Sequence, residues 1–426
     1  MELITFEDSG KLLRLADSLE TNAIMGWLSA SGTVPNDKFS FDECINNLKK
    51  NYKSILTDYP TFRIKIQEID NLQYWCYAKN EEIQFDNLIK INKDNKIEDE
   101  VPSTFDPTNA PLWRLYLSEI NEVIKIKIIV SHGIIDGRSL FDLFDLFASC
   151  ALNKELNEKL KNAKNQPVLY EYGKKDWFTK EITDKKLGNP FININIKNNE
   201  INPHVPLPSY VINPQWDVDY LPISKFCRKY NITPQSILMA IQNEAIRIYN
   251  KGKIDDIPIS IYIPIDNRNS KFASELFKKS LFFSHVGFIM PFLNNEKNIL
   301  ENMKNCYNIL KENLSTSKSC DIAYFSANMR NYETKKLSYP ENFPEPSKYI
   351  FASHLGLVGV GFNDVQFRSY SPVYENMYWP NLYGFHNKNV FSFMFNCPYN
   401  CPKEFIDSVK DTSLKYYNFI INDIKE

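Results

Sequence analysis

The chain has 426 residues, of which 43% are hydrophobic and 14% aromatic, so it can build a large core and a wholly disordered protein is excluded. Its 50 basic and 52 acidic residues give a formal net charge of -2, and without a basic stripe a nucleic-acid partner is not expected. With only 13 glycines, glycine-rich phosphate loops are scarce.

The eight cysteines are spread thinly over a long chain, which is typical of free thiols in a reducing compartment rather than of a disulfide framework. The first residues include acidic side chains and no apolar run of signal-peptide length. The longest apolar run, residues 281–293, is shorter than the about 20 residues that span a bilayer. We expect a soluble, cytoplasmic monomer without a transmembrane segment.

Apolar spacing predicts alternating helices and strands in the first half of the chain. Residues 41–52 have the spacing of an amphipathic helix, and residues 62–66 alternate as a half-buried strand does. Residues 112–117 and 123–130 are further strands, the second becoming apolar throughout as if it enters the interior. A helix with a broad apolar face follows at 140–151.

The middle of the chain, about residues 153–210, is dense in Lys, Asn and Pro and lacks helical periodicity, as linkers and long crossovers do. We therefore divide the chain into an N-terminal lobe at 1–165, a crossover at 166–207 and a C-terminal lobe at 208–426.

The second half is also mixed α/β. Thr233 followed by Pro234 has the residues of a helix N-cap and first helical position, and apolar residues follow at helical spacing. Residues 298–314 predict another helix, and residues 257–264 and 390–395 predict strands.

The sequence contains no phosphate-binding loop, no nucleophile elbow and no HExxH pattern. Its histidines are far apart, and Cys397 and Cys401 lack a second pair at metal-binding spacing, so neither a metal nor a redox cofactor is expected.

One segment carries chemistry: His132-Gly-Ile-Ile-Asp136-Gly137 lies between a predicted strand and a predicted helix, where α/β sheets commonly bind ligands. An imidazole can accept and return a proton near neutral pH, and Gly137 permits a tight turn. The same pattern also fits a buried histidine at a strand end and an aspartate that caps the next helix. The motif by itself leaves both interpretations open.

The surrounding landmarks resemble one enzyme superfamily. Besides HxxxDG, they are PTFR, PLWRL, ITPQSIL, PIDNR, HVGF and SHLG, at residues 60–63, 111–115, 232–238, 264–268, 285–288 and 353–356. Their order resembles that of chloramphenicol acetyltransferase, plant BAHD acyltransferases, fungal alcohol acetyltransferases, wax ester synthases and peptide-synthetase condensation domains.

This resemblance implies an α/β fold of two chloramphenicol acetyltransferase-like lobes. Each lobe is a mixed β-sheet with helices, and the lobes form a V with the active-site tunnel between them. His132 is then the catalytic base in the tunnel. Asp136, four residues later, could orient His132 across one helical turn. The resemblance instead turns Asp136 away to pair with Arg268, and we prefer this interpretation because glycines flank the turn.

Further site residues are expected from the second half. Candidate oxyanion donors are backbone N–H groups near Gly137 and the segment Ser353, His354 and Gly356, although these also fit an ordinary turn. Tyr383 and His386 lie in an aromatic stretch that could line an acceptor pocket, and packing explains that stretch equally well.

The expected reaction moves an acyl group from a thioester, acyl-CoA and acetyl-CoA among the candidates, to a small alcohol or amine, with acyl-CoA as co-substrate and no other cofactor. Two alternatives remain: condensation with a carrier-protein thioester, and a catalytically silent binding protein of the same fold. Ser131 stands where condensation domains carry a second histidine, His354 stands where the family has asparagine, and no DFGWG is present.

Overall fold

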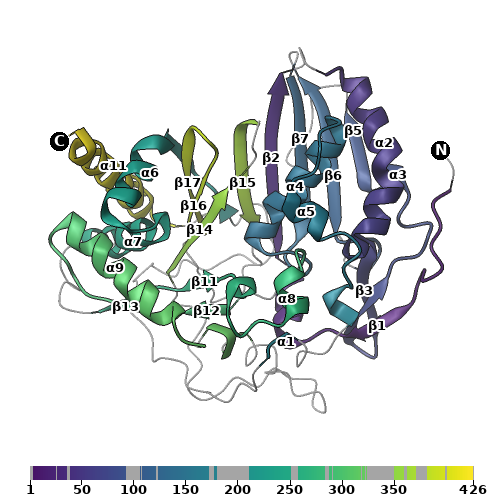
Figure 1. Ribbon diagram of the computed structural model, residues 1–426, viewed down its shortest axis with the longest axis horizontal. Helices are drawn as coiled ribbons and strands as arrows, with labels where there is room; N and C mark the ends of the chain where they lie inside the picture. The colour runs from purple at the N-terminus through teal and green to yellow at the C-terminus, as the bar shows by residue number, and fades with distance from the viewer. Residues whose placement is uncertain are drawn as a thin grey trace.

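Two five-stranded sheets, one in each lobe, organise the chain (Figure 1). The computed structural model describes residues 3–24, 26–35, 39–92, 106, 108–120, 123–171, 177–179, 211–250, 258–283, 287–289, 291–317, 319–321, 323, 350–358, 362–370, 381–398 and 401–425. Each lobe is mixed α/β, as the sequence predicts.

The first-lobe sheet has the strand order β15-β2-β7-β6-β5, in which β5 and β6 run parallel and the other pairs antiparallel. The central strand β7 places alternate isoleucines in the main core, and Ile129 packs on the other face with Trp27 and Tyr116. The strands are β2 (Trp27–Pro35), β5 (Ile89–Asn92), β6 (Trp113–Ile120), β7 (Val123–Ser131) and β15 (Asn363–Tyr370).

Two long helices, α2 (Phe41–Asp58) and α4 (Gly137–Ala151), pack against each other over this sheet. Ser40 caps α2 through a capping box with Glu43, which explains why the helix begins where its apolar stripe does. The remaining elements of this lobe are α1 (Ser18–Ala23), α3 (Phe85–Leu88), α5 (Glu158–Asn162), η1 (Pro60–Arg63), η3 (Leu169–Glu171) and the small sheet of β1 (Leu12–Leu15), β4 (Leu72–Tyr77) and β3 (Ile64–Ile69).

The second-lobe sheet consists of β14 (Phe351–Leu357), β16 (Asn381–His386), β17 (Val390–Pro398), β8 (Val211–Ile212) and β9 (Gln215–Asp219). Helix α7 (Pro234–Tyr249) packs on β14 and β16, and Thr233 caps it with proline at the first turn, as predicted. Helices α6 (Tyr220–Tyr230), α9 (Ile299–Leu314) and α11 (Lys403–Lys425) cover the outer side of this lobe (Figure 1).

The strand predicted at 257–264 is broken into two short ones because the chain changes partners. β10 (Ile259–Ser260) pairs with β13 (Phe292–Leu293), whereas β11 (Ile263–Ile265) pairs with β12 (Gly287–Ile289). Between them, the N–H of Tyr262 donates to the carbonyl of Ile350 at 2.7 Å. The segment then continues through η6 (Asn267–Asn269) and α8 (Glu275–Lys279) toward the first lobe.

Strand β15 comes from the second half of the chain but completes the first-lobe sheet beside β2 (Figure 1). Its Phe367 lies among Phe141 of α4 and Tyr383 and Phe385 of β16, with ring centroids 5.1 to 6.3 Å apart. A division of the chain by residue number did not anticipate this exchange. Most of the proposed crossover lies outside the described residues.

All eight cysteines are free, as expected from their spacing. Within the described ranges, no helix combines the length and apolarity that crossing a bilayer requires. The same part of the chain brings no three potential metal ligands together.

We expect Phe367→Ala to lower the free energy of unfolding by about 3–5 kcal/mol, because it empties a site shared by both lobes. Chemical denaturation measures this loss. The exposed neighbour Gln366 is the control, and Gln366→Ala should change stability by less than about 0.5 kcal/mol. Equal losses in the two variants would contradict the packing of β15 between the lobes.

Candidate functional site

The HxxxDG segment leaves the end of β7 and is held by the chain around α1. The backbone N–H of His132 donates to the carbonyl of Gly26 at 2.6 Å. The hydroxyl of Ser131 donates to the carbonyl of Ile24 at 2.8 Å and accepts from the N–H of Gly133 at 3.1 Å. Ser131 is fully buried, so this position braces the loop.

The imidazole of His132 is half-buried, and its Nδ1 atom is buried without a hydrogen-bond partner in the described part of the chain. Burial lowers the pKa of His132, and nearby backbone carbonyls and the Asp136 carboxylate offset only part of that effect. The ring is therefore neutral near pH 7, the state that a general base requires.

Asp136 does two things at once. Its Oδ1 accepts from the N–H of Ser139 at 2.7 Å and so caps α4, while its Oδ2 accepts from Nη2 of Arg268 at 2.9 Å. The predicted ion pair is present, and helix capping, the simpler explanation of the motif, holds as well. With both oxygens engaged, Asp136 does not orient His132.

Arg268 is buried and meets four partners across the lobes. Besides Asp136, it donates to Oδ1 of Asp266 at 2.6 Å, to the hydroxyl of Ser139 at 2.7 Å and to the carbonyl of Leu281 at 2.8 Å. Burial alone would lower the pKa of Arg268, but the Asp136 and Asp266 carboxylates more than offset it. Burial raises the pKa of Asp136, and the guanidinium opposes that shift.

Gly137 has a role different from the predicted tight turn. It is the first residue of α4, and a Cβ there would lie 3.0 Å from Cδ2 of Leu355 on β14. The absent side chain lets β14 of the second lobe approach the start of α4.

A contact that the sequence did not predict also holds β14 against the start of α4. Arg138, the second residue of α4, donates to the carbonyl of Leu355 at 2.9 Å and also to the carbonyl of Leu357. Gly356 lies between these carbonyls in the left-handed region, at φ 84°, where the pairing of β14 with β16 is irregular. Gly356 thus shapes the strand end that receives Arg138, and the only sequence signal was an arginine directly after HxxxDG.

The other predicted residues of the second lobe separate onto two faces of its sheet. Ser353 of β14 is opposite Tyr383 of β16, on the face toward the first lobe. His354 lies on the other face and stacks on His386, with ring centroids 5.5 Å apart. Because of this alternation, Ser353 lies near Tyr383. The predicted pairs Tyr383 with His386 and Ser353 with His354 are separated onto opposite faces.

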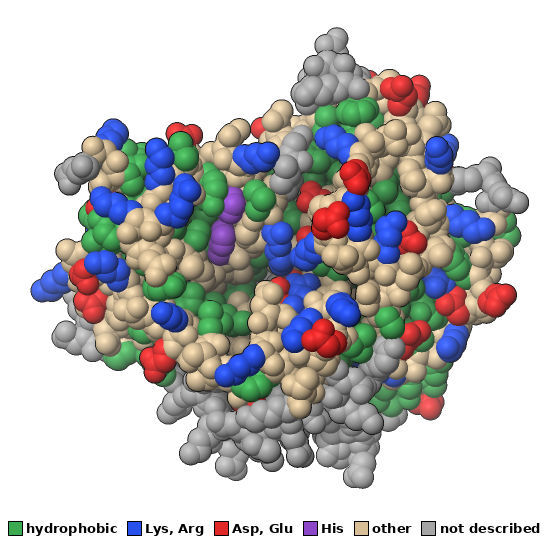
Figure 2. Space-filling view, in the orientation of Figure 1, with side chains coloured by type: hydrophobic (Ala, Val, Ile, Leu, Met, Phe, Trp, Pro, Cys, Tyr) green, Lys and Arg blue, Asp and Glu red, His purple; other side chains and the backbone are tan. Residues whose placement is uncertain are grey.

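The two histidines form an aromatic stack with Tyr220, whose ring centroid is 3.8 Å from that of His386. Burial, with His386 and Arg138 nearby, lowers the pKa of His354 to about 3. Burial also lowers the pKa of His386. Histidine side chains are visible over the second-lobe strands, at the edge of the hollow between the lobes (Figure 2).

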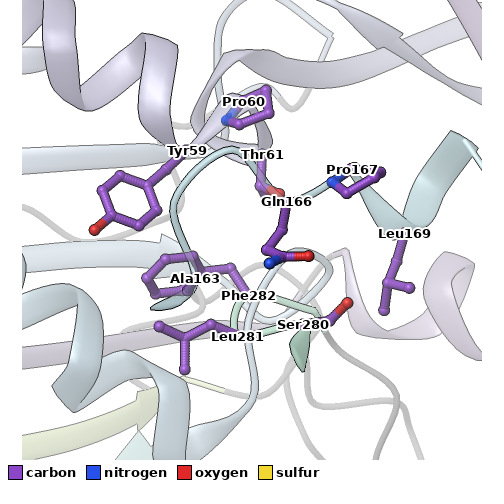
Figure 3. Close-up of a pocket in the computed structure, with 10 residues that line it drawn as sticks. All are labelled: Tyr59, Pro60, Thr61, Ala163, Gln166, Pro167, Leu169, Ser280, Leu281 and Phe282. Carbon is purple, nitrogen blue, oxygen red and sulfur yellow. The ribbon is translucent and has the colours of Figure 1, made fainter. Parts of the chain in front are cut away.

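A separate pocket lies between η1, the chain after α5 and residues Ser280–Phe282 (Figure 3). None of the predicted site residues lines it. Leu281 connects it with the site, because the Leu281 carbonyl accepts from Arg268. The predicted site instead consists of side chains that meet between the lobes.

No family model and no curated protein sequence matches the chain. Several solved structures, however, are similar to this chain over nearly its whole length. Polyketide synthase associated protein 5 from Mycobacterium tuberculosis is similar at a TM-score of 0.63 and 11% identity, over 96% of this chain and 98% of that one. The epimerization domain from the third module of tyrocidine synthetase B is similar at a TM-score of 0.60 and 11% identity, over 98% of this chain and 99% of that one.

TRI101 of F. graminearum, solved with coenzyme A and T-2 mycotoxin, is similar at a TM-score of 0.61 and 12% identity, over 94% of this chain and 97% of that one. The chain has the chloramphenicol acetyltransferase-like fold. At these identities the likeness shows the fold alone, and it confirms the predicted two-lobed architecture.

We expect Asp136→Ala and Arg268→Ala each to lower the free energy of unfolding by about 3–5 kcal/mol. Arg268→Ala leaves the buried Asp136 carboxylate without its cation, and Asp136→Ala removes both the ion pair between the lobes and the cap of α4. The double variant should lose less than the sum, with a coupling of about 0.5–3 kcal/mol. Denaturant unfolding of the four proteins measures the cycle. Strictly additive losses would show that the two side chains do not interact.

Proposed function

We propose that the chain is an acyltransferase that moves an acyl group from a thioester, acyl-CoA in the first instance, to a small alcohol or amine with His132 as general base. The observation that carries this proposal is the separation of roles within HxxxDG. Asp136 is engaged by Ser139 and Arg268, while His132 keeps a neutral, half-buried imidazole that takes no part in that ion pair. The fold shared with TRI101, which was solved with coenzyme A, supports the proposal.

In this mechanism the imidazole of His132 removes a proton from the acceptor hydroxyl or amine as the acceptor attacks the thioester carbonyl. A tetrahedral oxyanion forms, and its collapse breaks the carbon–sulfur bond. The imidazolium returns the proton to the departing thiolate, so His132 ends neutral. A positioned base of this kind contributes about 10²–10⁴-fold in rate.

The oxyanion needs a hydrogen-bond donor, and two groups suit this role. The backbone N–H groups of Gly137 and Arg138 lie at the N-terminus of α4, which favours negative charge, whereas the N–H of Ser139 is already bonded to Asp136. Ser353 faces the first lobe from β14. His354 does not suit the role, because it stacks with His386 on the other face.

Ser131 helps to decide between the two possible acyl donors, free acyl-CoA and a carrier-protein thioester. Its buried hydroxyl braces the loop before His132, so this position supplies no second imidazole. We therefore place free acyl-CoA ahead of a carrier-protein thioester. The deciding assay supplies labelled acetyl-CoA, longer acyl-CoAs or an acyl carrier protein, each with a panel of alcohols and amines, and follows thiol release. Turnover with the carrier thioester alone would assign the chain to condensation-type chemistry.

We expect His132→Ala to lower kcat by at least about 10²-fold while the melting temperature stays within a few degrees, because Nδ1 of the ring has no hydrogen-bond partner among the described residues and the ring takes no part in the Asp136–Arg268 ion pair. Thiol release and thermal unfolding of the same preparation measure both. Full activity in a folded His132→Ala protein would overturn the mechanism, and an inactive wild type across the whole panel would favour a silent binding protein.

The pH profile gives an independent test. Since burial lowers the pKa of His132, the base stays deprotonated below the ordinary histidine value of about 6.5. We expect kcat/KM to be flat from about pH 6.5 to 8 and to fall only on further acidification, as the imidazole gains its proton. A fall that begins above pH 7 would contradict a buried, neutral base.

A further inference from the structure

Three polar side chains, which we call the Asn381 cluster, gather on the second-lobe face that looks toward the first lobe. Asn381 and Tyr383 come from β16 and Ser369 from β15. The amide of Asn381 donates to the Tyr383 hydroxyl at 3.4 Å, and the hydroxyl of Ser369 also hydrogen-bonds to that phenol oxygen. Asn381 is 4% and Ser369 3% exposed.

The cluster leaves two hydrogen-bonding positions unused. Oδ1 of Asn381 is buried, and no donor in the described ranges reaches it. Burial raises the pKa of Tyr383 to about 12, so the phenol keeps its proton. The phenol and the Ser369 hydroxyl share one hydrogen bond, which uses one of their two protons and leaves the other available as a donor. One buried acceptor beside one buried donor complements a hydroxyl group, which both donates and accepts.

An aromatic wall continues from the cluster. The ring of Phe351 lies 5.3 Å from that of Tyr383, and Tyr262 stacks on Phe351 at 5.3 Å and on Phe288 at 4.4 Å. Such a surface suits an apolar body attached to the hydroxyl group.

Strand register relates the cluster to His132. Ser369 of β15 is opposite Leu28 of β2, and Leu28 is opposite Val130 of β7, two residues before His132. Two strand spacings separate the backbones of Ser369 and Val130 by about 10 Å. Ser369 and the residue that carries the imidazole therefore lie at the same end of the first-lobe sheet.

We propose that the Asn381 cluster binds a second hydroxyl group of the acceptor, remote from the hydroxyl that is acylated. Oδ1 of Asn381 accepts the hydrogen bond of that hydroxyl, and the pair of Tyr383 and Ser369 hydroxyls donates its remaining proton to the oxygen. The acceptor class is then an alcohol with an apolar body and a remote hydroxyl. This inference rests on the proposed function and narrows its substrate.

The test compares two probes, the α,ω-diol of octane and its monomethyl ether, which differ only in the remote O–H. We expect wild-type kcat/KM with acetyl-CoA to favour the diol by about tenfold, mostly through KM, because the ether cannot donate to Asn381. Asn381→Leu should abolish the preference. Tyr383→Phe should reduce it, and serves as the second variant if Asn381→Leu does not fold.

Gln73 of β4 is the matched control. Its Oε1 is also buried without a partner in the described part of the chain, but β4 belongs to the small first-lobe sheet with β1 and β3. Gln73→Leu should keep the diol preference. Equal kcat/KM for the two probes in the wild type, or the same loss of preference in Gln73→Leu as in Asn381→Leu, would overturn the proposed hydroxyl site.

Ligand-observed NMR titration without an acyl donor separates this inference from the proposed function. Binding of the diol that weakens about tenfold in Asn381→Leu, without thiol release by the wild type, would keep the hydroxyl site and overturn the acyltransferase. Thiol release without any preference for the diol would keep the acyltransferase and overturn the hydroxyl site. Neither binding nor turnover would overturn both.

Discussion

The buried ion pair between Asp136 and Arg268 is the constraint on which the rest of the site depends. The two residues are 132 positions apart, and their contact joins the start of α4 to the segment that crosses from the second lobe. Ser139 and the carbonyl of Leu281 complete the set of Arg268 partners. Taking two charges out of water is costly, and only a geometry that meets nearly every donor and acceptor offsets that cost. This fixes how the lobes meet.

A second set of contacts reinforces the junction on the other side of α4. Arg138 reaches the carbonyls of Leu355 and Leu357, and the left-handed Gly356 lets the strand end turn toward it. Strand β15 adds a ladder of backbone hydrogen bonds, because this strand of the second half of the chain pairs with β2 of the first. His132 therefore stands beside a junction held by an ion pair, by backbone acceptors and by an exchanged strand.

Side-chain alternation along β14 and β16 decides which polar groups can face a substrate. Ser353, Tyr383 and Asn381 look toward the first lobe, while His354 and His386 stack together on the opposite face. The stack explains their low pKa values by burial without assigning them chemistry. The polar side chains on the inner faces of β14 and β16 are thus neutral, whereas the charged residues of the junction come from α4 and from the segment that carries Arg268.

Local sequence patterns were enough to predict several structural features of this protein. The caps at Asp136 and Thr233, the helical stripes and the alternating strand β7 are decided within a few residues, by hydrogen bonds to nearby N–H groups and by side-chain periodicity. The partner of Asp136 and the two-lobed fold were predicted only through resemblance to a superfamily, since no local signal connects residue 136 to residue 268.

Other features of the fold and of the site could be found only in the tertiary structure. The exchange of β15, the contact of Arg138 with β14 and the break at Tyr262 each depend on which distant backbone offers a free hydrogen-bonding group. Likewise, the irregular pairing between His354 and Gly356 shifts the register of β14, so that Leu357 lies opposite His386 of β16. The sequence by itself determined most helices and strands, and it identified His132 as the candidate base. Only long-range packing determined which side chains share the space around that histidine, because strand register and lobe contacts are properties of the whole fold.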